Sequence, residues 1–346
     1  MRKYKFKGEN LVFREGLAAF NGGYERRIGF VDIHGNIIIK PTYKRIGHLY
    51  PGFRDGLCKA SYRKRWGFIN KNGEWVVPPI YNDVQSYSEG VAAVLQGNKV
   101  EYIDTFGKKI FESVFFSSSS YLNLILFSGD FHEGLANVCF FDKGTKTFMR
   151  GFINKTGEFV FPPEFEDPDA YFIDGVAITK KHNHKYKGVL SHDGQYIEAK
   201  IFDYTNIFFD YTNIFNVGTG VAIYRNGKKY GLVDKQGVPV TEAIYESVFP
   251  FTEGLALVSY NGQRRFIDNS GRFVIENGQV NFEAPFSDGL ALVRYKKHFG
   301  FINHKGEFVI EPTLRRAYSF SDGVAQVEID GKWGLINTKG EKIAGF

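Results

Sequence analysis

Glycines recur at a nearly fixed interval along this chain of 346 residues, and this periodicity restricts the possible folds more than any other feature. Their successive spacings are 38, 34, 50, 37, 43, 34, 35 and 34 residues, so the underlying unit has about 34 residues. Self-similarity at such a period is typical of repeat architectures, in which each unit packs on its neighbours. We therefore predict nine repeats with a structural turn glycine in each: Gly35, Gly73, Gly107, Gly157, Gly194, Gly237, Gly271, Gly306 and Gly340.

Each copy contains three short apolar runs separated by turns. In the eighth copy these runs are 290–295, 301–303 and 308–310, rich in Val, Ile, Leu, Phe and Tyr. Such runs between glycine turns are typical of strands joined as hairpins. No stretch shows a sustained helical period with capping residues. We predict that each repeat is a three-stranded antiparallel meander, with an irregular tail, that completes its core by stacking on its neighbours.

The expected fold class is all-β, with tandem three-stranded antiparallel meander repeats stacked as an open β-solenoid. A closed, propeller-like ring is the alternative. Neither end of the chain shows the split unit that commonly fastens a propeller, which favours the open array. The whole chain is expected to form one array with repeats at 13–52, 53–86, 87–130, 131–171, 172–214, 215–250, 251–285, 286–319 and 320–346.

Two polar positions recur in the turns. One stands three residues before the repeat glycine, as Asn70 does before Gly73. Its side-chain oxygen can accept from the backbone two residues on, while the glycine adopts a positive φ. Asn, Asp and Ser all occur here, which favours a turn over a calcium site. The other is an acid before the opening glycine, as in Asp55-Gly56, and we expect it to cap backbone amides along one edge of the array.

The strings at 332–337 and 65–70, KWGLIN and RWGFIN, resemble the bacterial WG repeat, also called the KWG repeat. The resemblance covers nearly everything from Phe13 to the end of the chain, in nine units. It implies repeated β-structure and a binding role, and it supplies no catalytic residues. The glycine of the motif is replaced by Glu101 in the third copy and by Arg265 in the seventh. We expect those two copies to be locally distorted.

Basic residues gather in the turn between the first and second strands of several copies. If the repeats stack in register, these turns would line up as a basic edge opposite an acidic one, and the basic edge would attract an acidic protein surface. The alternative is that exposed hairpin turns collect Lys and Arg for solubility. No nucleic-acid-binding motif accompanies the charge. The candidate binding residues are Arg63, Lys64, Arg65, Lys180, Lys181, Lys228, Lys229, Arg264, Arg265, Lys296 and Lys297.

Insertions interrupt the period between Gly107 and Gly157 and between Gly194 and Gly237. The second contains a seven-residue duplication over 203–216, which adds Tyr204 and Tyr211 to the candidate binding residues. A third insertion, KKHNHK at 180–185, lengthens a hairpin turn of repeat five. Its two histidines stand among lysines without a third ligand, which argues against a metal site. Insertions in repeat arrays often form binding loops, although loops also tolerate drift.

Chemical motifs are not found in the sequence. There is no GxSxG, P-loop, HExxH or CxxC, so we predict no catalytic residue, cofactor or metal. There is no signal-peptide core or membrane-spanning run, and a cytoplasmic protein is expected. The resulting hypothesis is a non-catalytic scaffold that binds an acidic protein. The alternatives are a glycan or cell-envelope binder and, third, an enzyme whose site is assembled from several repeats.

Overall fold

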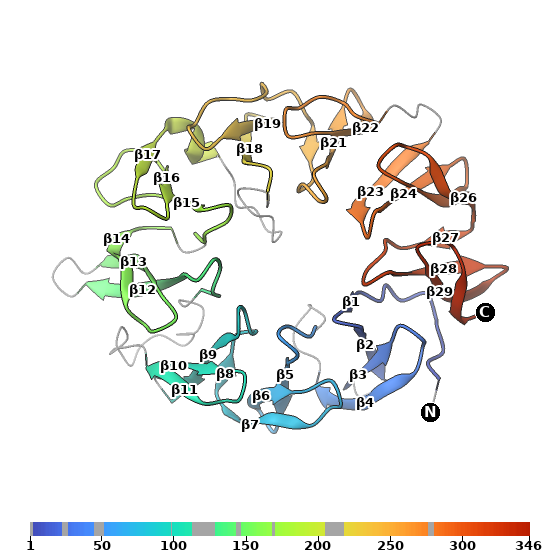
Figure 1. Cartoon of the computed structure of the whole chain (residues 1–346), viewed down its shortest axis with the longest axis horizontal. Helices are drawn as coiled ribbons and strands as arrows, with labels where there is room; N and C mark the ends of the chain where they lie inside the picture. The colour runs from blue at the N-terminus through green and yellow to red at the C-terminus, as the bar shows by residue number, and fades with distance from the viewer. Residues whose placement is uncertain are drawn as a thin grey trace. The chain divides into compact units, whose positions relative to one another are not determined.

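The computed structural model describes residues 3–22, 27–44, 52–97, 99–112, 129–142, 147–167, 170–204, 218–275 and 280–346. These residues form antiparallel strands and one short 3-10 helix, η2 (Lys200–Tyr204), with no α-helix among them. Within this described part no helix is long and apolar enough to cross a bilayer. The strands make nine separate small sheets (Figure 1). The expectation of an all-β fold is confirmed.

The sheets follow one another along the chain, and most of their strands pair in sequence order. The earlier sheets are β1 (Phe13–Arg14), β2 (Leu17–Gly22), β3 (Arg27–Asp32), β4 (Ile37–Lys44); β5 (Cys58–Tyr62), β6 (Arg65–Ile69), β7 (Trp75–Tyr81); β8 (Asp83–Val84), β9 (Val91–Gln96), β10 (Lys99–Asp104), β11 (Lys109–Glu112); β12 (Ala136–Asp142), β13 (Thr147–Ile153), β14 (Phe159–Phe165); and β15 (Val176–Thr179), β16 (Gly188–Ser191), β17 (Tyr196–Glu198). The later sheets are β18 (Val221–Asn226), β19 (Lys229–Asp234); β20 (Ser247–Val248), β21 (Ala256–Tyr260), β22 (Gln263–Ile267); β23 (Asn281–Ser287), β24 (Leu290–Tyr295), β25 (His298–Ile302), β26 (Phe308–Leu314); and β27 (Arg316–Ala317), β28 (Val324–Ile329), β29 (Lys332–Asn337), β30 (Lys342–Gly345).

The tails of several repeats are more regular than expected. Strands β5–β7, β12–β14 and β15–β17 form the predicted three-stranded meanders. Elsewhere a short strand from the preceding tail joins the next sheet, as β8 does when Asp83 and Val84 pair with Leu95 and Val94 of β9. Strands β20 and β27 join β21 and β28 in the same way. Residues that had been expected to be irregular therefore connect one sheet to the next.

In eight copies the turn before the repeat glycine has the expected side-chain hydrogen bonds. In the fifth copy the Ser191 hydroxyl instead donates to Asp193 and to the carbonyl of Gln195. Asn70 Oδ1 accepts from the backbone N–H groups of Asn72 and Glu74, both at 3.0 Å. Gly73 follows with a φ of 82°, a conformation that side chains disfavour. The prediction of an Asx-type turn is confirmed here. The same pattern of acceptance recurs at Asp32, Asp104, Asn154, Asp234, Asp268, Asn303 and Asn337.

The glycine of the WG motif lies where the third strand presses on the second. From Trp66 to Phe68 the strand β6 advances two residues while its partner β7 advances four. The extra length brings the backbone of β7 so close that a Cβ on Gly67 would lie 2.3 Å from the carbonyl oxygen of Val77. The φ of Gly67 is not positive, so its backbone conformation does not require glycine. Glycine is required here because the neighbouring backbone approaches so closely. The same register irregularity faces Gly151 and Gly300.

The two copies without this glycine lack that close approach. Opposite Glu101, β10 and β11 pair residue for residue, with Glu101 facing Glu112 and Tyr102 facing Phe111. In the copy that carries Arg265, β22 pairs with β21 alone, and the following segment meets it through one bridge, Ile267 to Phe273. Both copies depart from the register seen at Gly67, as expected. The side chain at this position is not by itself the cause, because the copy that keeps Gly231 also has a two-stranded sheet.

Two compact units divide the chain, and each is built by stacking neighbouring sheets. Unit 1 comprises residues 1–19, 31–37 and 203–346, and unit 2 comprises residues 20–30 and 38–202. In unit 2, Phe68 of one repeat packs with Tyr87 and Val94 of the next. In unit 1, the ring centroids of Phe301 and Phe320 lie 4.7 Å apart in the same kind of contact. The expectation that stacking completes each core is confirmed.

In unit 1, residues 3–12 form an N-terminal strap along the last repeat. The backbone N–H of Tyr4 donates to the carbonyl of Gly35 at 2.8 Å, and the hydroxyl of Tyr318 donates to the carbonyl of Gly8 at 2.8 Å. A Cβ on Gly8 would lie 2.8 Å from the indole ring of Trp333, so the strap lies directly on that ring. Residues 3–19 thus belong to the same compact unit as the C-terminal repeats (Figure 1).

Candidate functional site

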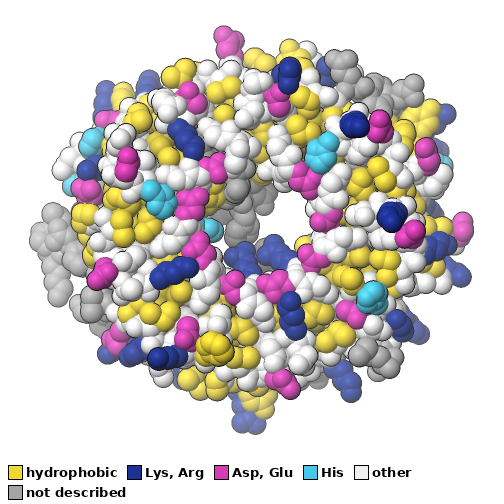
Figure 2. Space-filling model, in the orientation of Figure 1, with side chains coloured by type: hydrophobic (Ala, Val, Ile, Leu, Met, Phe, Trp, Pro, Cys, Tyr) yellow, Lys and Arg dark blue, Asp and Glu magenta, His cyan; other side chains and the backbone are white. Residues whose placement is uncertain are grey.

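The predicted basic turns are hairpin tips that join the first and second strands of a repeat. Residues 62–65 connect β5 to β6, and residues 295–298 connect β24 to β25. Arg63, Lys64, Arg65, Lys228, Lys296 and Lys297 are exposed. On the face drawn in Figure 2, basic side chains are interspersed with acidic ones. Binding through positive charge would therefore depend on individual hairpin tips rather than on the total charge of the molecule.

Four of the predicted basic residues are paired with acids from nearby strands and tails. The ammonium of Lys229 donates to Glu246 and lowers the pKa of that carboxyl. Because these cations already have a carboxylate partner, they offer less charge to an external ligand. The pairs are Lys180–Glu166 (2.8 Å), Lys181–Glu164 (3.1 Å), Lys229–Glu246 (2.5 Å) and Arg264–Glu283 (3.8 Å).

The lengthened turn of repeat five is held by acids on both sides. His182 Nδ1 lies 3.2 Å from Glu166, and His184 Nδ1 lies 3.1 Å from Glu198. Burial acts to raise the pKa of Glu166, but hydrogen bonds from Lys180 and His182 bring it below its ordinary value overall. Each imidazole thus faces its own carboxylate. The basic side chains Lys180, Lys181, His182 and His184 of this turn therefore contact acids of the protein itself.

The tip at residues 62–65 keeps its charge in a strained conformation. Arg63 and Lys64 have φ values of 48° and 65°, in the left-handed region that residues with a side chain rarely adopt. Neither residue, nor Arg65, forms an ion pair with a described residue. The guanidinium of Arg63 lies 5.2 Å from the ring centroid of Tyr62, whose side chain is 54% exposed.

Corresponding tips elsewhere carry residues that suit this backbone. Asn261 and Gly262 occupy the β21–β22 tip with φ values of 51° and 74°, and Asp330 and Gly331 occupy the β28–β29 tip with 52° and 76°. Asn-Gly and Asp-Gly are the preferred pairs for a two-residue turn of this type. Lys296, at 53°, is another long cation in a left-handed tip position. Tips 62–65 and 295–298 therefore depart from the residue types that the turn favours.

The acid before each opening glycine connects consecutive repeats. Asp55 accepts from the backbone N–H of Gly90 at 2.8 Å, and Asp288 accepts from Gly323 at 2.9 Å. The prediction that these acids cap backbone amides is confirmed, and the amide belongs to the opening glycine of the next copy. The remaining pairs are Glu89–Gly134, Glu133–Gly175, Glu253–Gly289 and, between the last copy and the first, Asp322–Gly16.

Several of these acids also contact a basic side chain from the next copy. Lys155 lies 3.1 Å from Glu89, and His192 lies 3.1 Å from Glu133. In the same way His304 lies 3.2 Å from Glu253. Burial acts to raise the pKa of Glu89, but the bonds from Lys155 and from backbone N–H groups lower it overall. The expected acidic edge is therefore largely occupied by contacts within the molecule.

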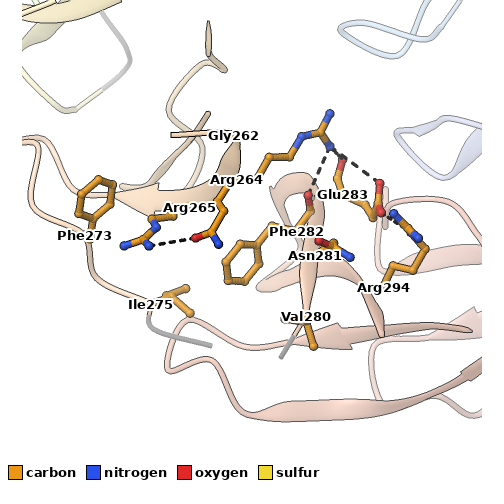
Figure 3. A pocket seen from close by; sticks show the side chains of 11 residues that line it. Gly262, Arg264, Arg265, Phe273, Ile275, Val280, Asn281, Phe282, Glu283 and Arg294 are labelled. Atoms are coloured by element: carbon orange, nitrogen blue, oxygen red, sulfur yellow. Dashed lines mark hydrogen bonds and ion pairs between the residues drawn. The ribbon is translucent and has the colours of Figure 1, made fainter. Parts of the chain in front are cut away.

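A pocket of about 800 Å³ lies in unit 1 beside the copy that lacks the motif glycine (Figure 3). Phe273, Ile275 and Phe282 contribute its apolar wall, and Ile275 and Phe282 are buried. Arg264 and Arg265 come from β22, and Phe282 comes from β23 of the next sheet. The pocket thus combines two neighbouring repeats. Its size is within the range of small-molecule sites.

Three arginines and one glutamate set the charge of this pocket. Arg294 Nε donates to Glu283 at 2.6 Å, and Arg264 Nη1 donates to the carbonyl of Glu283 at 3.0 Å. Arg265 donates to the side-chain oxygen of Gln263 at 3.0 Å, and its guanidinium lies 5.1 Å from the ring centroid of Phe273. Among the described residues Arg265 has no carboxylate partner, so the pocket carries an excess of positive charge.

Among the other titratable groups that the structure describes, no nucleophile has a base beside it. Burial raises the pKa of the Cys58 thiol to about 12, so it stays protonated at neutral pH. Burial also raises the pKa of Asp130, which lies 3.8 Å from Arg54, and burial lowers the pKa of His132. No group of three His, Cys, Asp or Glu residues with metal-site geometry occurs in the described ranges. Asp130 and Arg54 thus form an ion pair, and the lowered pKa of His132 favours its neutral imidazole.

Some predicted site residues are not brought together with the others. Tyr204 ends η2, whereas Tyr211 and most of the duplicated segment lie outside the described residues. The insertion after Gly107 is described only as far as residue 112 and again from residue 129. Sequence reasoning placed Arg264 and Arg265 on a basic edge and missed the pocket that they line. The available signal was the loss of the motif glycine at Arg265.

Comparison with known proteins finds segments that match a repeat family and a solved structure with a similar fold. Five segments match the model of the WG containing repeat, at residues 28–58, 66–99, 151–186, 230–263 and 299–333. No curated protein matches the chain significantly. A crystal structure of the eukaryotic initiation factor is similar with 12% identity and a TM-score of 0.55, over 88% of this chain and 88% of that one. At this identity the likeness concerns the fold alone.

Two further solved structures are less similar. Hsv2 of Kluyveromyces lactis has 9% identity and a TM-score of 0.32, over 82% of this chain and 89% of its own. AztD of Citrobacter koseri has 10% identity and a TM-score of 0.33, over 91% and 90%. Scores this low do not support a fold assignment.

Proposed function

We propose that this WG repeat protein is a non-catalytic scaffold that binds an acidic surface of another protein, with the hairpin tip at residues 62–65 in the contact. The backbone at Arg63 and Lys64 supports the proposal most directly. It holds two long cations in a left-handed conformation that costs about 1 to 2 kcal/mol per residue. Strained backbone collects at functional sites, so charge that is kept under strain is expected to serve binding.

The surroundings of the tip support the same role. Arg63, Lys64 and Arg65 are exposed and have no carboxylate partner among the described residues. Tyr62 presents an exposed aromatic ring beside them. Aromatic and arginine side chains are enriched at protein interfaces, and complementary charge speeds and orients association. The tip at residues 295–298, with Tyr295, has a similar composition and is a second candidate contact.

The first test replaces the tip with the sequence that the turn prefers. The double variant Arg63→Asn/Lys64→Gly is expected to raise the free energy of unfolding by about 1 kcal/mol, because it relieves the strain at both positions. It is also expected to weaken binding of poly-L-glutamate, a probe for an acidic protein surface, by about tenfold at low salt. Urea unfolding followed by fluorescence measures the first effect, and titration calorimetry measures the second.

Two exposed lysines outside the tips provide the control for this test. The double variant Lys305→Gln/Lys339→Gln removes the same charge and is expected to change binding less than about twofold. Equal weakening in both double variants would reject the tip as a site and leave only net charge. Probe binding that persists in high salt, or a cell-wall glycan bound more tightly than poly-L-glutamate, would favour the glycan alternative and contradict the proposal.

We further infer that the scaffold has nine repeats and that its last repeat closes on its first. Two contacts within unit 1 support closure, because they repeat those between consecutive copies. Asp322 accepts from Gly16 at 2.7 Å, as Asp288 does from Gly323. A Cβ on Gly35 would lie 3.1 Å from Ala344 Cβ, in the manner that Gly340 meets the third strand of its preceding copy. These observations favour the propeller-like alternative over the open solenoid.

Solution scattering tests the closure directly. A compact chain of this length is expected to have a radius of gyration of about 20 Å. Nine sheets stacked about 10 Å apart would instead form a rod roughly 90 Å long, with a radius of gyration near 28 Å. A value close to the smaller number is expected, and a value close to the larger one would contradict closure while leaving the proposed binding tip untouched.

A further inference from the structure

The pocket in unit 1 lies beside the copy in which Arg265 replaces the glycine of the motif. In the copy where Gly300 stands, the third strand β26 pairs with β25 and fills the space beside it. In the preceding copy Arg265 occupies the equivalent position, and the segment around Phe273 is held only by a bridge to Ile267 and a bond from Val274 N–H to the carbonyl of Phe266 at 3.1 Å. Among the described residues of this copy no third strand pairs with β22, and the pocket lies beside β22.

We propose that this pocket is a binding site for a small organic oxyanion, a carboxylate or a phosphate monoester on an apolar body. The apolar body would contact Phe273, the partly exposed aromatic ring of the cavity wall, which is backed by the buried Phe282. The oxyanion would be held by Arg265, whose guanidinium stacks on Phe273 and has one neutral hydrogen-bond partner, Gln263. Arginine is suited to this task because its planar fork binds carboxylate and phosphate oxygens in pairs.

The other charged groups direct the ligand toward Arg265. Glu283 neutralises much of the charge of its two arginine partners, at 2.6 Å from Arg294 and 3.8 Å from Arg264. These contacts hold the two arginines on the β23 side of the pocket (Figure 3). Arg265 faces no carboxylate among the described residues and lies beside an aromatic ring. Arg265 is therefore the arginine of this pocket whose charge is least neutralised by carboxylates, and its surroundings exclude part of the solvent.

This site is distinct from the proposed protein-binding tip. Tip 62–65 belongs to unit 2, whereas the pocket lies wholly within unit 1. The tip offers exposed charge to a large surface, and the pocket offers an enclosed apolar wall with one unpaired cation. Failure of one proposal leaves the other standing, since each has its own residues and its own probe.

The experiment uses the full chain and matched probes that differ in charge. N-acetylphenylalanine and phenyl phosphate supply an oxyanion on an aromatic body, and N-acetylphenylalaninamide supplies the same body without charge. By ligand-observed NMR titration the two anions are expected to bind with millimolar dissociation constants, as suits ligands of this size. The dissociation constant of the amide is expected to be higher by a factor of about ten or more, because the amide loses a charge-assisted hydrogen bond.

Two arginine variants assign any binding to the pocket. Arg265→Gln is expected to weaken both anions by about tenfold. Arg272→Gln is the control, because Arg272 lies in the same repeat with a side chain that is 78% exposed and paired with Asp268 outside the pocket. Unchanged thermal unfolding of both variants excludes a folding effect. Equal binding of acid and amide, equal effects of the two substitutions, or no binding of either anion would each overturn the proposal.

Discussion

Replacing Gly67 by alanine is expected to lower the free energy of unfolding by about 2 to 3 kcal/mol, the upper range for overpacking a well-packed site. The added Cβ would lie 2.3 Å from the carbonyl oxygen of Val77 and 2.7 Å from backbone atoms of Pro78. These are backbone atoms of a paired strand, so they cannot rotate away as a side chain could. Urea unfolding followed by tryptophan fluorescence and by circular dichroism measures the loss.

The third repeat supplies the control for this substitution. Glu101 occupies the position of Gly67 there, and its partner strand runs beside it without the two extra residues. Glu101→Ala is expected to change the free energy of unfolding by less than about 0.5 kcal/mol, since it removes only a surface ion pair with Lys109. A loss at Glu101 as large as that at Gly67 would show that the position is sensitive for a reason other than backbone approach.

Replacing Gly157 by alanine is expected to cost about 3 kcal/mol, from two sources. Its φ of 86° is disfavoured for alanine by about 1 to 2 kcal/mol. The new Cβ would also lie 2.6 Å from Cδ2 of Phe111 in the preceding repeat, which overpacks that contact. Phe111 stacks on Tyr102 with ring centroids 4.5 Å apart, so the ring has little room to move. Unfolding in urea is again the measurement.

Gly134 separates the two contributions at Gly157. It has a φ of 79° and no heavy atom within 4 Å of an added Cβ. Gly134→Ala is therefore expected to cost only the backbone strain, about 1 to 2 kcal/mol. In the background of Phe111→Ala, the additional cost at Gly157 should fall to the value at Gly134. If Gly157→Ala and Gly134→Ala cost the same in the parent protein, the contact between repeats contributes nothing.

Local sequence rules predicted the turns and strands because these depend on neighbours in the chain. The Asx turn at Asn70 follows from a side-chain oxygen and N–H groups a few residues on. The N–H that Asp55 caps lies 35 residues away, so the sequence predicted the capping role but not its partner in the next copy. The role of Gly67 could not be predicted in this way, since it depends on an irregular register with residues ten positions away. The contact of Gly157 with Phe111 depends on how two repeats stack. Sequence spacing alone does not supply that distance.

The candidate sites show the same division. The exposed tip at residues 62–65 could be identified from its composition, but the left-handed backbone of Arg63 and Lys64 is evident only from the structure. The departure at Arg265 was visible in the sequence as a missing glycine. The pocket beside it could not be predicted, because its wall combines Phe273 next to β22 with Phe282 from β23 of the next sheet.

The N-terminal strap has a consequence for how the chain is made. Gly8 bonds to Tyr318, 310 positions later in the chain, and also lies against Trp333. A ribosome adds about 5 to 20 residues per second, so many seconds pass between the synthesis of the strap and that of its binding surface. During that interval the contacts of Gly8 with Tyr318 and Trp333 cannot form. The strap can therefore bind only after all the intervening repeats have been synthesised.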